Sequence, residues 1–589
     1  MSSFREGTKV KTKIILNLGA SFEFPRELWP RLCSRIETIL YGQKMLFPEE
    51  DSIEQYARVL ASRIRATSFR PPKKKEQENI EYEDGISVLG SNTENGRSVG
   101  AEHVALHGIQ TVNLPEIFKL VGFNHSQIKM ALGLVAARMV HPSSERETYR
   151  WLSKESALGE LLGIDFSTKP LLSLYRISDL IYENIFDIEK KIFSRVSQLF
   201  NLSQIITLYD LTNTYFEGNP STSKAKRGRS KEKRSDCPLI TVALVLDSSG
   251  FIRRTKFFAG NVSEQETLEK MLIKLEAEPG NLVIMDRGIS TSKNIAWLIK
   301  NKYRYLVVSK ETYREFDHNL ASPLETASGD EISIYRTVNK DCTEARLHCY
   351  SEKRAIKENG ITKRRVDILE DGLNKLNKNL SNSRCKKNLE YILKKIGNLE
   401  TKSKGIAQHY KITVIDNSKE KKETDPLIAK QILFEKIPKE GSILTSPGVY
   451  CLKTNDLNFS AIQMWQTYIM LTDLESVFRS LKSELGLRPI FHWKGDRIEG
   501  HLFITILAYQ SVQAIRQNLK KNNINDSWWT IRNGLINHQR TTTVFPRRDL
   551  DPIKIRKANI PEPYQKKIYE TLNITSRPGG VKKLKPTKE

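Results

Sequence analysis

Apolar residues along the chain change their spacing at several points, and each change predicts a change of structure. In residues 1–70 they recur at helical intervals, until two prolines and three lysines at 71–75 mark a boundary. The polar stretch that continues to about residue 100 predicts a loop or a short hairpin. Helical spacing returns in residues 113–202, where one helix ends before His141 and a second, long helix is expected at 173–199.

After residue 203 the apolar spacing becomes that of strands, with helices between the later ones. The expected elements are strand, strand, strand, helix, strand, helix and strand, at 204–218, 237–250, 251–260, 263–278, 281–286, 290–301 and 303–309. The first three strands predict an antiparallel meander, because turn residues separate them. This order of elements is the one that a ribonuclease-H-like fold requires.

Residues 310 to about 455 interrupt the expected ribonuclease-H-like series of strands and helices. Leucines at 369, 373, 376 and 380, followed by a second apolar series at 389–399, predict a lysine-rich antiparallel helical hairpin. Strand-like pieces flank the hairpin at 410–415 and 448–454. A long helix from about residue 461 to 485 follows.

The predicted fold class is α/β: a ribonuclease-H-like core, in which helices flank a mixed sheet, with a helical N-terminal unit and a large insertion before the last catalytic helix. The expected divisions are an N-terminal region and linker that could bind DNA (1–100), a helical domain (101–202), the first part of the core (203–310), the insertion (311–455), the part of the core with the catalytic helix (456–520) and a C-terminal region with a basic tail (521–589). No internal repeat indicates a solenoid or propeller.

The amino-acid composition indicates which class of molecule the protein binds. The chain of 589 residues has 94 Lys and Arg against 69 Asp and Glu, a formal net charge of +25. Such a surplus favours a polyanion, with nucleic acid first, although a generally basic proteome would also explain it. No long apolar run and no signal-like start are present, so a cytoplasmic protein without a membrane span is expected. The six cysteines form no CxxC pair and are expected to be reduced thiols.

Three acidic residues stand where chemistry could occur. Asp210 and Asp286 each follow an apolar strand segment, and two carboxylates at the ends of neighbouring buried strands can share a divalent metal. Glu475 could supply a third carboxylate from the long helix. Tyr468, Glu475 and Lys482 are seven residues apart, so they would share one helix face. An ordinary charged face of an amphipathic helix would explain this spacing equally well.

Four ordered segments resemble one known family. LYDLTNTYFEGN, FFAGNVSEQETL, VIMDRGIS and YIMLTDLESVFRSLKSELGLRPIFHWKGDRIEGHLFI are similar to the DDE transposases of bacterial insertion sequences, in the branch that carries a Tyr-Arg-Glu-Lys signature. The resemblance covers roughly residues 105–515. It implies a ribonuclease-H-like catalytic core and the transposition of DNA.

The resemblance assigns roles to the acidic residues. Asp210, Asp286 and Glu475 match the first, second and third catalytic carboxylates, which in a two-metal mechanism hold ions about 3.5–4 Å apart across the scissile phosphate. Mg²⁺ is the expected ion, two ions are expected, and Mn²⁺ could substitute. Asp210 would bridge the ions, Asp286 would bind one of them, and Glu475 the other.

The signature itself is matched at three of four places, by Tyr468, Glu475 and Lys482. Leu471 stands where the signature has arginine, and a leucine cannot contact phosphate. Arg479 or Arg488 could supply this contact instead. Tyr468, Lys482, Arg479 and Arg488 are therefore the expected DNA-binding residues.

The function that the resemblance implies is cleavage of the ends of an insertion sequence and their joining to target DNA. The expected partners are double-stranded DNA, as element ends and as target, and further copies of the chain that form a homo-oligomer when two ends are paired. Location with the bacterial nucleoid follows. Two alternatives remain: a catalytically inactive DNA-binding descendant, and a metal-dependent nuclease without strand transfer.

Several further residues stay open at this point. Thr212, Asn213 and Asn261 could act near the metal or in turns, and His492 and His501 could touch DNA or metal or be structural, which is the expectation. Glu484 and Glu499 are reserve candidates for the third carboxylate. Tyr350 or Tyr410 could stack on a base if excision passes through a DNA hairpin. Residues 1–70, residues 113–202 and the basic tail could each read the element ends.

Overall fold

The computed structural model divides the chain into two compact units, residues 1–90 with 546–549, and residues 91–545 with 550–589. The residues that the structure describes are 2–6, 9–13, 16, 18, 22–41, 50–66, 86–87, 89–200, 206–218, 220–228, 234, 236–273, 280–326, 329, 331–382, 384–417, 427–548 and 550–584. The proline and lysine run at 71–75 and the last residues of the basic tail lie outside them.

The first unit combines a hairpin with two helices. Strands β1 (Ser2–Glu6) and β2 (Lys9–Lys13) pair antiparallel, and α1 (Trp29–Tyr41) packs against α2 (Asp51–Ala66). A small core that includes Leu32 and Ile53 joins the two helices.

After the strand β3 (Asn92–Ser98), the second unit continues with helices. They are α3 (Gly100–Thr111), α4 (Leu114–Leu120), α5 (His125–Val140), α6 (Glu145–Lys154), α7 (Leu158–Leu162), α8 (Leu171–Glu183) and α9 (Ile185–Phe200). The prediction of one helix at 173–199 was wrong, because the helix breaks at Asn184. The Asn184 side chain donates to the Leu180 carbonyl and the Asn184 carbonyl accepts from Ile188, which ends α8 and starts α9.

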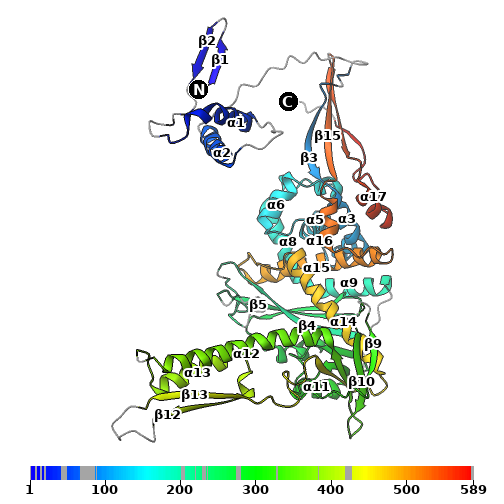
Figure 1. Cartoon of the computed structure of the whole chain (residues 1–589). Helices are drawn as coiled ribbons and strands as arrows, with labels where there is room; N and C mark the ends of the chain where they lie inside the picture. The colour runs from blue at the N-terminus through cyan, green and yellow to red at the C-terminus, as the bar shows by residue number, and fades with distance from the viewer. Residues whose placement is uncertain are drawn as a thin grey trace. The chain divides into compact units, whose positions relative to one another are not determined.

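A nine-stranded mixed sheet forms the centre of this unit (Figure 1). Its order is β6-β5-β4-β7-β8-β14-β11-β10-β9, with bounds β4 (Ile206–Tyr215), β5 (Leu239–Leu246), β6 (Ile252–Ala259), β7 (Leu282–Met285), β8 (Arg304–Val308), β9 (Ser322–Glu325), β10 (Glu331–Val338), β11 (Ala345–Ser351) and β14 (Val449–Thr454). β4, β5 and β6 form the predicted antiparallel meander, and β4, β7 and β8 run parallel.

The segment 310–455 contributes more to this sheet than its sequence indicated. Strands β9, β10, β11 and β14 all lie in it and extend the sheet beyond β8 through antiparallel pairs. Its middle forms the predicted helical hairpin, α12 (Glu352–Leu380) and α13 (Leu389–Lys402), which packs on the ribbon of β12 (Tyr410–Asp416) and β13 (Ala429–Lys436).

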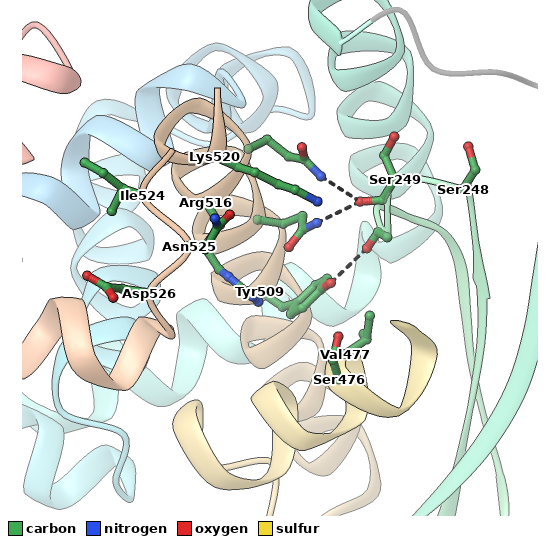
Figure 2. Close-up of a pocket in the computed structure, with 13 residues that line it drawn as sticks. Ser248, Ser249, Ser476, Val477, Tyr509, Arg516, Lys520, Ile524, Asn525 and Asp526 are labelled. Atoms are coloured by element: carbon green, nitrogen blue, oxygen red, sulfur yellow. Dashed lines mark hydrogen bonds between the residues drawn. The ribbon is translucent and has the colours of Figure 1, made fainter. Parts of the chain in front are cut away.

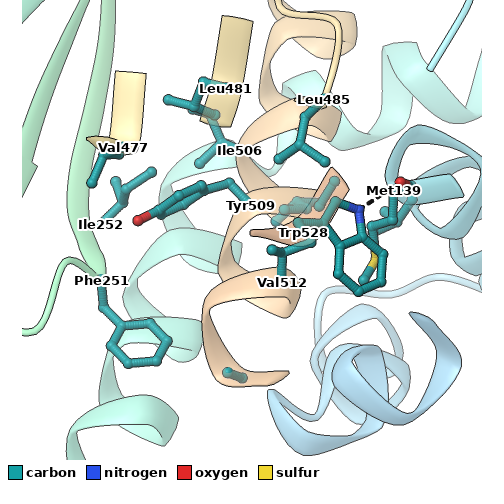
Figure 3. Packing of buried hydrophobic residues seen from close by; sticks show 14 of the residues in the cluster. Met139, Phe251, Ile252, Val477, Leu481, Leu485, Ile506, Tyr509, Val512 and Trp528 are labelled. Carbon is teal, nitrogen blue, oxygen red and sulfur yellow. Dashed lines mark hydrogen bonds between the residues drawn. The ribbon is translucent and has the colours of Figure 1, made fainter. Parts of the chain in front are cut away.

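Alternate residues of the central strands enter two separate cores. Tyr209, Leu211 and Met285 pack with α10 (Leu268–Leu272) and α11 (Ser292–Lys300) on one face. The other face is covered by α9, α14 (Ala461–Arg479) and α15 (Gly495–Lys520), whose apolar side chains join the large core. Figure 3 shows part of it, where Trp528 donates its indole N–H to the Met139 carbonyl at 2.8 Å.

The C-terminal strands of the second unit form a sheet with its first strand. After α16 (Trp528–Leu535), strands β15 (Gln539–Arg547), β16 (Leu550–Ala558) and β17 (Lys582–Leu584) form a four-stranded sheet with β3 (Asn92–Ser98), and α17 (Pro563–Thr571) lies between β16 and β17 in the chain. β3 falls in the stretch expected to be a loop or hairpin; its residues are mostly exposed, so no apolar alternation revealed it. Across the described residues, no helix is long and apolar enough to cross a bilayer.

Candidate functional site

Asp210 and Asp286 lie where the parallel pairing of β4 with β7 ends. The expectation that Asp210 ends its strand was wrong, because β4 continues to Tyr215 through its pairing with β5. Tyr209 of β4 is in register with Met285 of β7, so the residues that follow them, Asp210 and Asp286, are neighbours across the pair. Asp210 is half-buried, and Asp286, at the point where β7 ends, is exposed to solvent. We call these two residues the carboxylate site.

The local sequence explains why the carboxylates stand at this edge. All four residues of β7 are buried and apolar, and the chain turns directly after them. The Asp286 side chain accepts the backbone N–H of Arg287 at 2.6 Å, and its carbonyl accepts the N–H of Ile289, which closes the turn. Thr291 then caps α11. In open α/β sheets, the carboxyl ends of parallel strands are where ligands bind.

The helix that carries Glu475 crosses the same region of the sheet. α14 packs over β4, β7 and β8, and its Met464, Val477 and Phe478 belong to the core on that face. Asp210 lies between Tyr209 and Leu211, which face the opposite core, so strand alternation turns Asp210 toward the face of α14. The Glu475 backbone is in α14; its side chain is outside the described residues.

The expected DNA-binding residues lie along and after this helix. Tyr468 is half-buried in α14 and Arg479 is exposed at its end. Lys482 does not continue the α-helix, because residues Ser480–Glu484 form a π-helical turn. The expectation that seven-residue spacing aligns Lys482 with Tyr468 assumed an uninterrupted α-helix, and the wider turn changes that alignment. Lys482 and Arg488 are both half-buried.

His492 and His501 meet a different carboxylate, deep in the protein. The two oxygens of Glu145 accept from them, Oε2 at 2.5 Å from His492 Nε2 and Oε1 at 2.7 Å from His501 Nδ1. Because the Nδ1–H of His501 donates a hydrogen bond to Glu145, its Nε2 carries no proton in the neutral ring. This Nε2 accepts a hydrogen bond from Arg138 Nη2 at 3.2 Å. All four side chains are buried, and we call them the histidine cluster.

Charges balance inside the histidine cluster. Burial alone would raise the pKa of Glu145, but the hydrogen bonds and charges of His501 and His492 outweigh it and hold this pKa well below its usual range. Burial and the Arg138 charge lower the pKa of His501 to about 4, so the imidazole is neutral at pH 7. The cluster therefore links the Glu145 anion to the Arg138 cation through the neutral His501.

The histidine cluster also has the spacing of a metal site. The ligand atoms of Glu145, His492 and His501 lie within 4.8 Å of one another. However, Arg138 already supplies a positive charge, and both histidines donate protons that a metal would have to replace. The expected structural role of the histidines fits this geometry. Sequence reasoning missed Glu145 and Arg138, since they lie 347 to 363 residues from their partners.

Three of the other candidates, Glu484, Glu499 and Asn213, are engaged in structural contacts. Glu484 accepts from Ser480 and from the Trp529 backbone N–H at the start of α16. Glu499 pairs with Lys224. The Asn213 amide donates to Thr241 at 3.0 Å, and Asn261 is exposed beside β6.

A polar pocket that the sequence did not indicate lies where α14 and α15 approach the β5–β6 turn (Figure 2). It has a volume of about 430 Å³ and is lined by Ser476, which follows Glu475, and by Arg516 and Lys520 of α15. The amides of Gln513 and Gln517 donate to the Ser249 carbonyl and hold the turn against the helix.

The fold and the carboxylate site define an α/β protein with neighbouring acidic residues on two parallel strands, one within β4 and one directly after β7. Residues 202–510, just over half of the chain, match the family model described as the transposase DDE domain. The chain belongs to this family and is a transposase, which acts on DNA in transposition and DNA recombination. No curated protein matches the chain at a significant level.

Proposed function

We propose that this transposase cleaves the ends of an insertion sequence and joins them to target DNA by metal-dependent phosphoryl transfer. The observation that supports this most directly is the register of β4 and β7, which makes Asp210 and Asp286 neighbours at an accessible strand edge. α14, the helix of Glu475, crosses the same part of the sheet.

Asp210, Asp286 and Glu475 would hold the metal in this proposal. Carboxylate oxygens are the ligands that Mg²⁺ prefers, and the buried Thr212 hydroxyl, two residues after Asp210 on the same strand face, has no hydrogen-bond partner among the described residues. Two bound Mg²⁺ ions, which Mn²⁺ could replace, would polarise the scissile phosphate and activate water or a DNA 3′-hydroxyl. Asp210, Asp286 and Glu475 would together supply the carboxylate ligands for these ions.

The DNA contacts in the proposal are those of the Tyr-Arg-Glu-Lys branch. Lys482 would hold a backbone phosphate and Tyr468 would donate a hydrogen bond to another. Leu471 cannot take the arginine's part, and the exposed Arg479 and the half-buried Arg488 are the available substitutes. The first unit, the helices before β4 or the basic tail would read the element ends, and copies of the chain would pair two ends.

Two rivals make different predictions. An inactive DNA-binding descendant would bind element ends without cleaving them, and a plain nuclease would cleave them without joining. The presence of both neighbouring carboxylates favours an active enzyme over the first rival. Strand transfer separates the proposal from the second.

The test incubates the purified chain and Mg²⁺ with labelled DNA that carries the ends of its source element, beside the Glu475→Gln variant. Cleavage at the element boundary and joining to a second DNA, both lost in the variant, are the expected results. Binding without cleavage in Mg²⁺ and in Mn²⁺ would favour the inactive descendant, and cleavage without joining would favour the nuclease.

A further inference from the structure

A basic cavity opens beside the loop that follows Asp286. Its volume is about 520 Å³, and its walls come from the ends of β8, β11 and β14 and the start of α12. Five cations, Arg287, Lys310, Arg314, Arg346 and Arg354, line it beside two carboxylates, Glu311 and Glu315. The size is that of a small-molecule site, so the cavity admits part of one DNA strand and not a duplex.

Three of these cations are already paired with carboxylates. Arg314 and Arg354 both bind Glu358, with N–O distances of 2.5 and 3.0 Å, and Arg346 binds Glu311 at 3.2 Å. These ion pairs hold the three arginine side chains in the cavity lining.

Arg287 and Lys310 differ from the other three. Within the described parts of the chain neither has a carboxylate partner, and both are exposed. Arg287 Nη2 donates to the Lys310 carbonyl at 3.4 Å, and Lys310 Nζ donates to the Gly288 carbonyl at 3.1 Å. This double contact holds the loop after β7 against the loop after β8.

The same contacts keep Arg287 away from its neighbour Asp286. The Asp286 carboxylate accepts the backbone N–H of Arg287, while the guanidinium reaches across to the β8 loop. Two cations without a carboxylate partner among the described residues therefore line the cavity, and one of them, Arg287, directly follows Asp286 in the chain. An anion that extends from the carboxylate site into the cavity would meet both.

We propose that Arg287 and Lys310 bind backbone phosphates of the DNA strand that passes from the carboxylate site into the basic cavity. They act as positioning residues, because phosphate contacts fix the register of a strand without reading its sequence. This inference rests on the proposed function and adds two contacts outside the Tyr-Arg-Glu-Lys signature.

The test uses the double variant Arg287→Gln/Lys310→Gln in the full chain. Glutamine keeps an amide N–H for the two carbonyls and removes the charge. The matched control is Lys300→Gln/Lys302→Gln, which removes two exposed charges at the opposite end of β8. The affinity for labelled DNA that carries an element end is measured by fluorescence anisotropy at several salt concentrations, and thermal unfolding checks that each variant is folded.

The slope of log affinity against log salt should fall by about 2 in the double variant, since each phosphate contact contributes about 0.9, and stay unchanged in the control. A methylphosphonate next to the cleavage position should weaken binding by the wild type more than by the double variant. Equal slopes in both variants, or equal methylphosphonate effects at every position, would overturn the inference.

The same experiment separates this inference from the proposed function. Wild-type cleavage and joining with an unchanged salt slope in the double variant would refute the two contacts and leave the function standing. A reduced slope without any wild-type cleavage would support the contacts and count against the function. A wild type that does not bind the DNA would refute both.

Discussion

The carboxylate site and the histidine cluster contain similar side chains in opposite surroundings. Asp286 is exposed at a strand end and accepts a backbone N–H, whereas Glu145 is buried and accepts from two histidines beside an arginine. In the first region the carboxylates remain accessible to a metal and a phosphate. In the second, the charges are already balanced. Accessibility, and not the presence of acidic and histidine side chains, therefore separates a candidate reaction centre from a structural network.

The largest effect is expected at the carboxylate site. Asp286→Asn keeps an oxygen that can accept the Arg287 N–H but removes the negative charge, so DNA cleavage should fall at least about 1,000-fold, roughly 4 kcal/mol in activation free energy. The midpoint of thermal unfolding should hardly change, because Asp286 is exposed. Full cleavage by this variant would remove Asp286 from the site.

The histidine cluster should respond in the opposite way. Glu145→Gln leaves Arg138 buried without an anion, so the free energy of unfolding measured with denaturant should fall by about 3–5 kcal/mol. Glu147→Gln, which breaks a surface pair with Arg150 on the same helix, should cost less than about 1 kcal/mol. Equal stability of the two variants would contradict the charge balance described for the cluster.

The pH dependence of stability sharpens the same contrast. His501 has a folded-state pKa of about 4, below its ordinary value of 6.5, so between these values the unfolded chain binds a proton that the folded chain does not. Stability should therefore fall as the pH falls below 6.5, by about 2 kcal/mol between pH 6.5 and 5.

Two variants separate the contribution of His501 to the pH dependence of stability from the contributions of other titrating groups. His501→Gln should lose that part of the slope when denaturant unfolding is followed between pH 7 and 5, and Asp286→Asn should keep the wild-type slope. An unchanged slope in His501→Gln would mean that this imidazole is protonated in the folded protein.

The smallest effect is expected for Lys482, after the end of α14. Lys482→Gln should weaken binding to an element end and reduce the salt slope by about 1, since one phosphate contact is lost. Lys300→Gln serves as the control for charge alone. A slope equal to that of the control would remove Lys482 from the DNA contacts.

The sequence predicted the part of the fold in which local pattern is strong. The apolar segments of β4–β8 and the helical hairpin follow from periodicity, and Asp286 directly follows its strand as expected, whereas Asp210 lies within β4. Strands β10 and β11 were missed; β10 pairs with its chain neighbours β9 and β11, whereas the pairing of β11 with β14 joins segments about 100 residues apart. The break at Asn184 depends on one side-chain hydrogen bond.

The candidate site was predictable only where local sequence encodes it. The register of β4 against β7, which makes the two carboxylates neighbours, is a tertiary property. The Arg138 and Glu145 contacts to His501 span more than 350 residues and leave no local signal. The π-helical turn at Lys482 likewise has no mark in the residue spacing.

The most direct test of the proposal that the carboxylate site holds the metal is a measurement of Mn²⁺ binding. Bound Mn²⁺ is detected by electron paramagnetic resonance, with the chain in complex with DNA that carries an element end. Bound Mn²⁺ should be lost in Asp210→Asn/Asp286→Asn and retained in Glu145→Gln. Full Mn²⁺ binding by the double aspartate variant, with loss in Glu145→Gln, would contradict the account and make the histidine cluster the metal site.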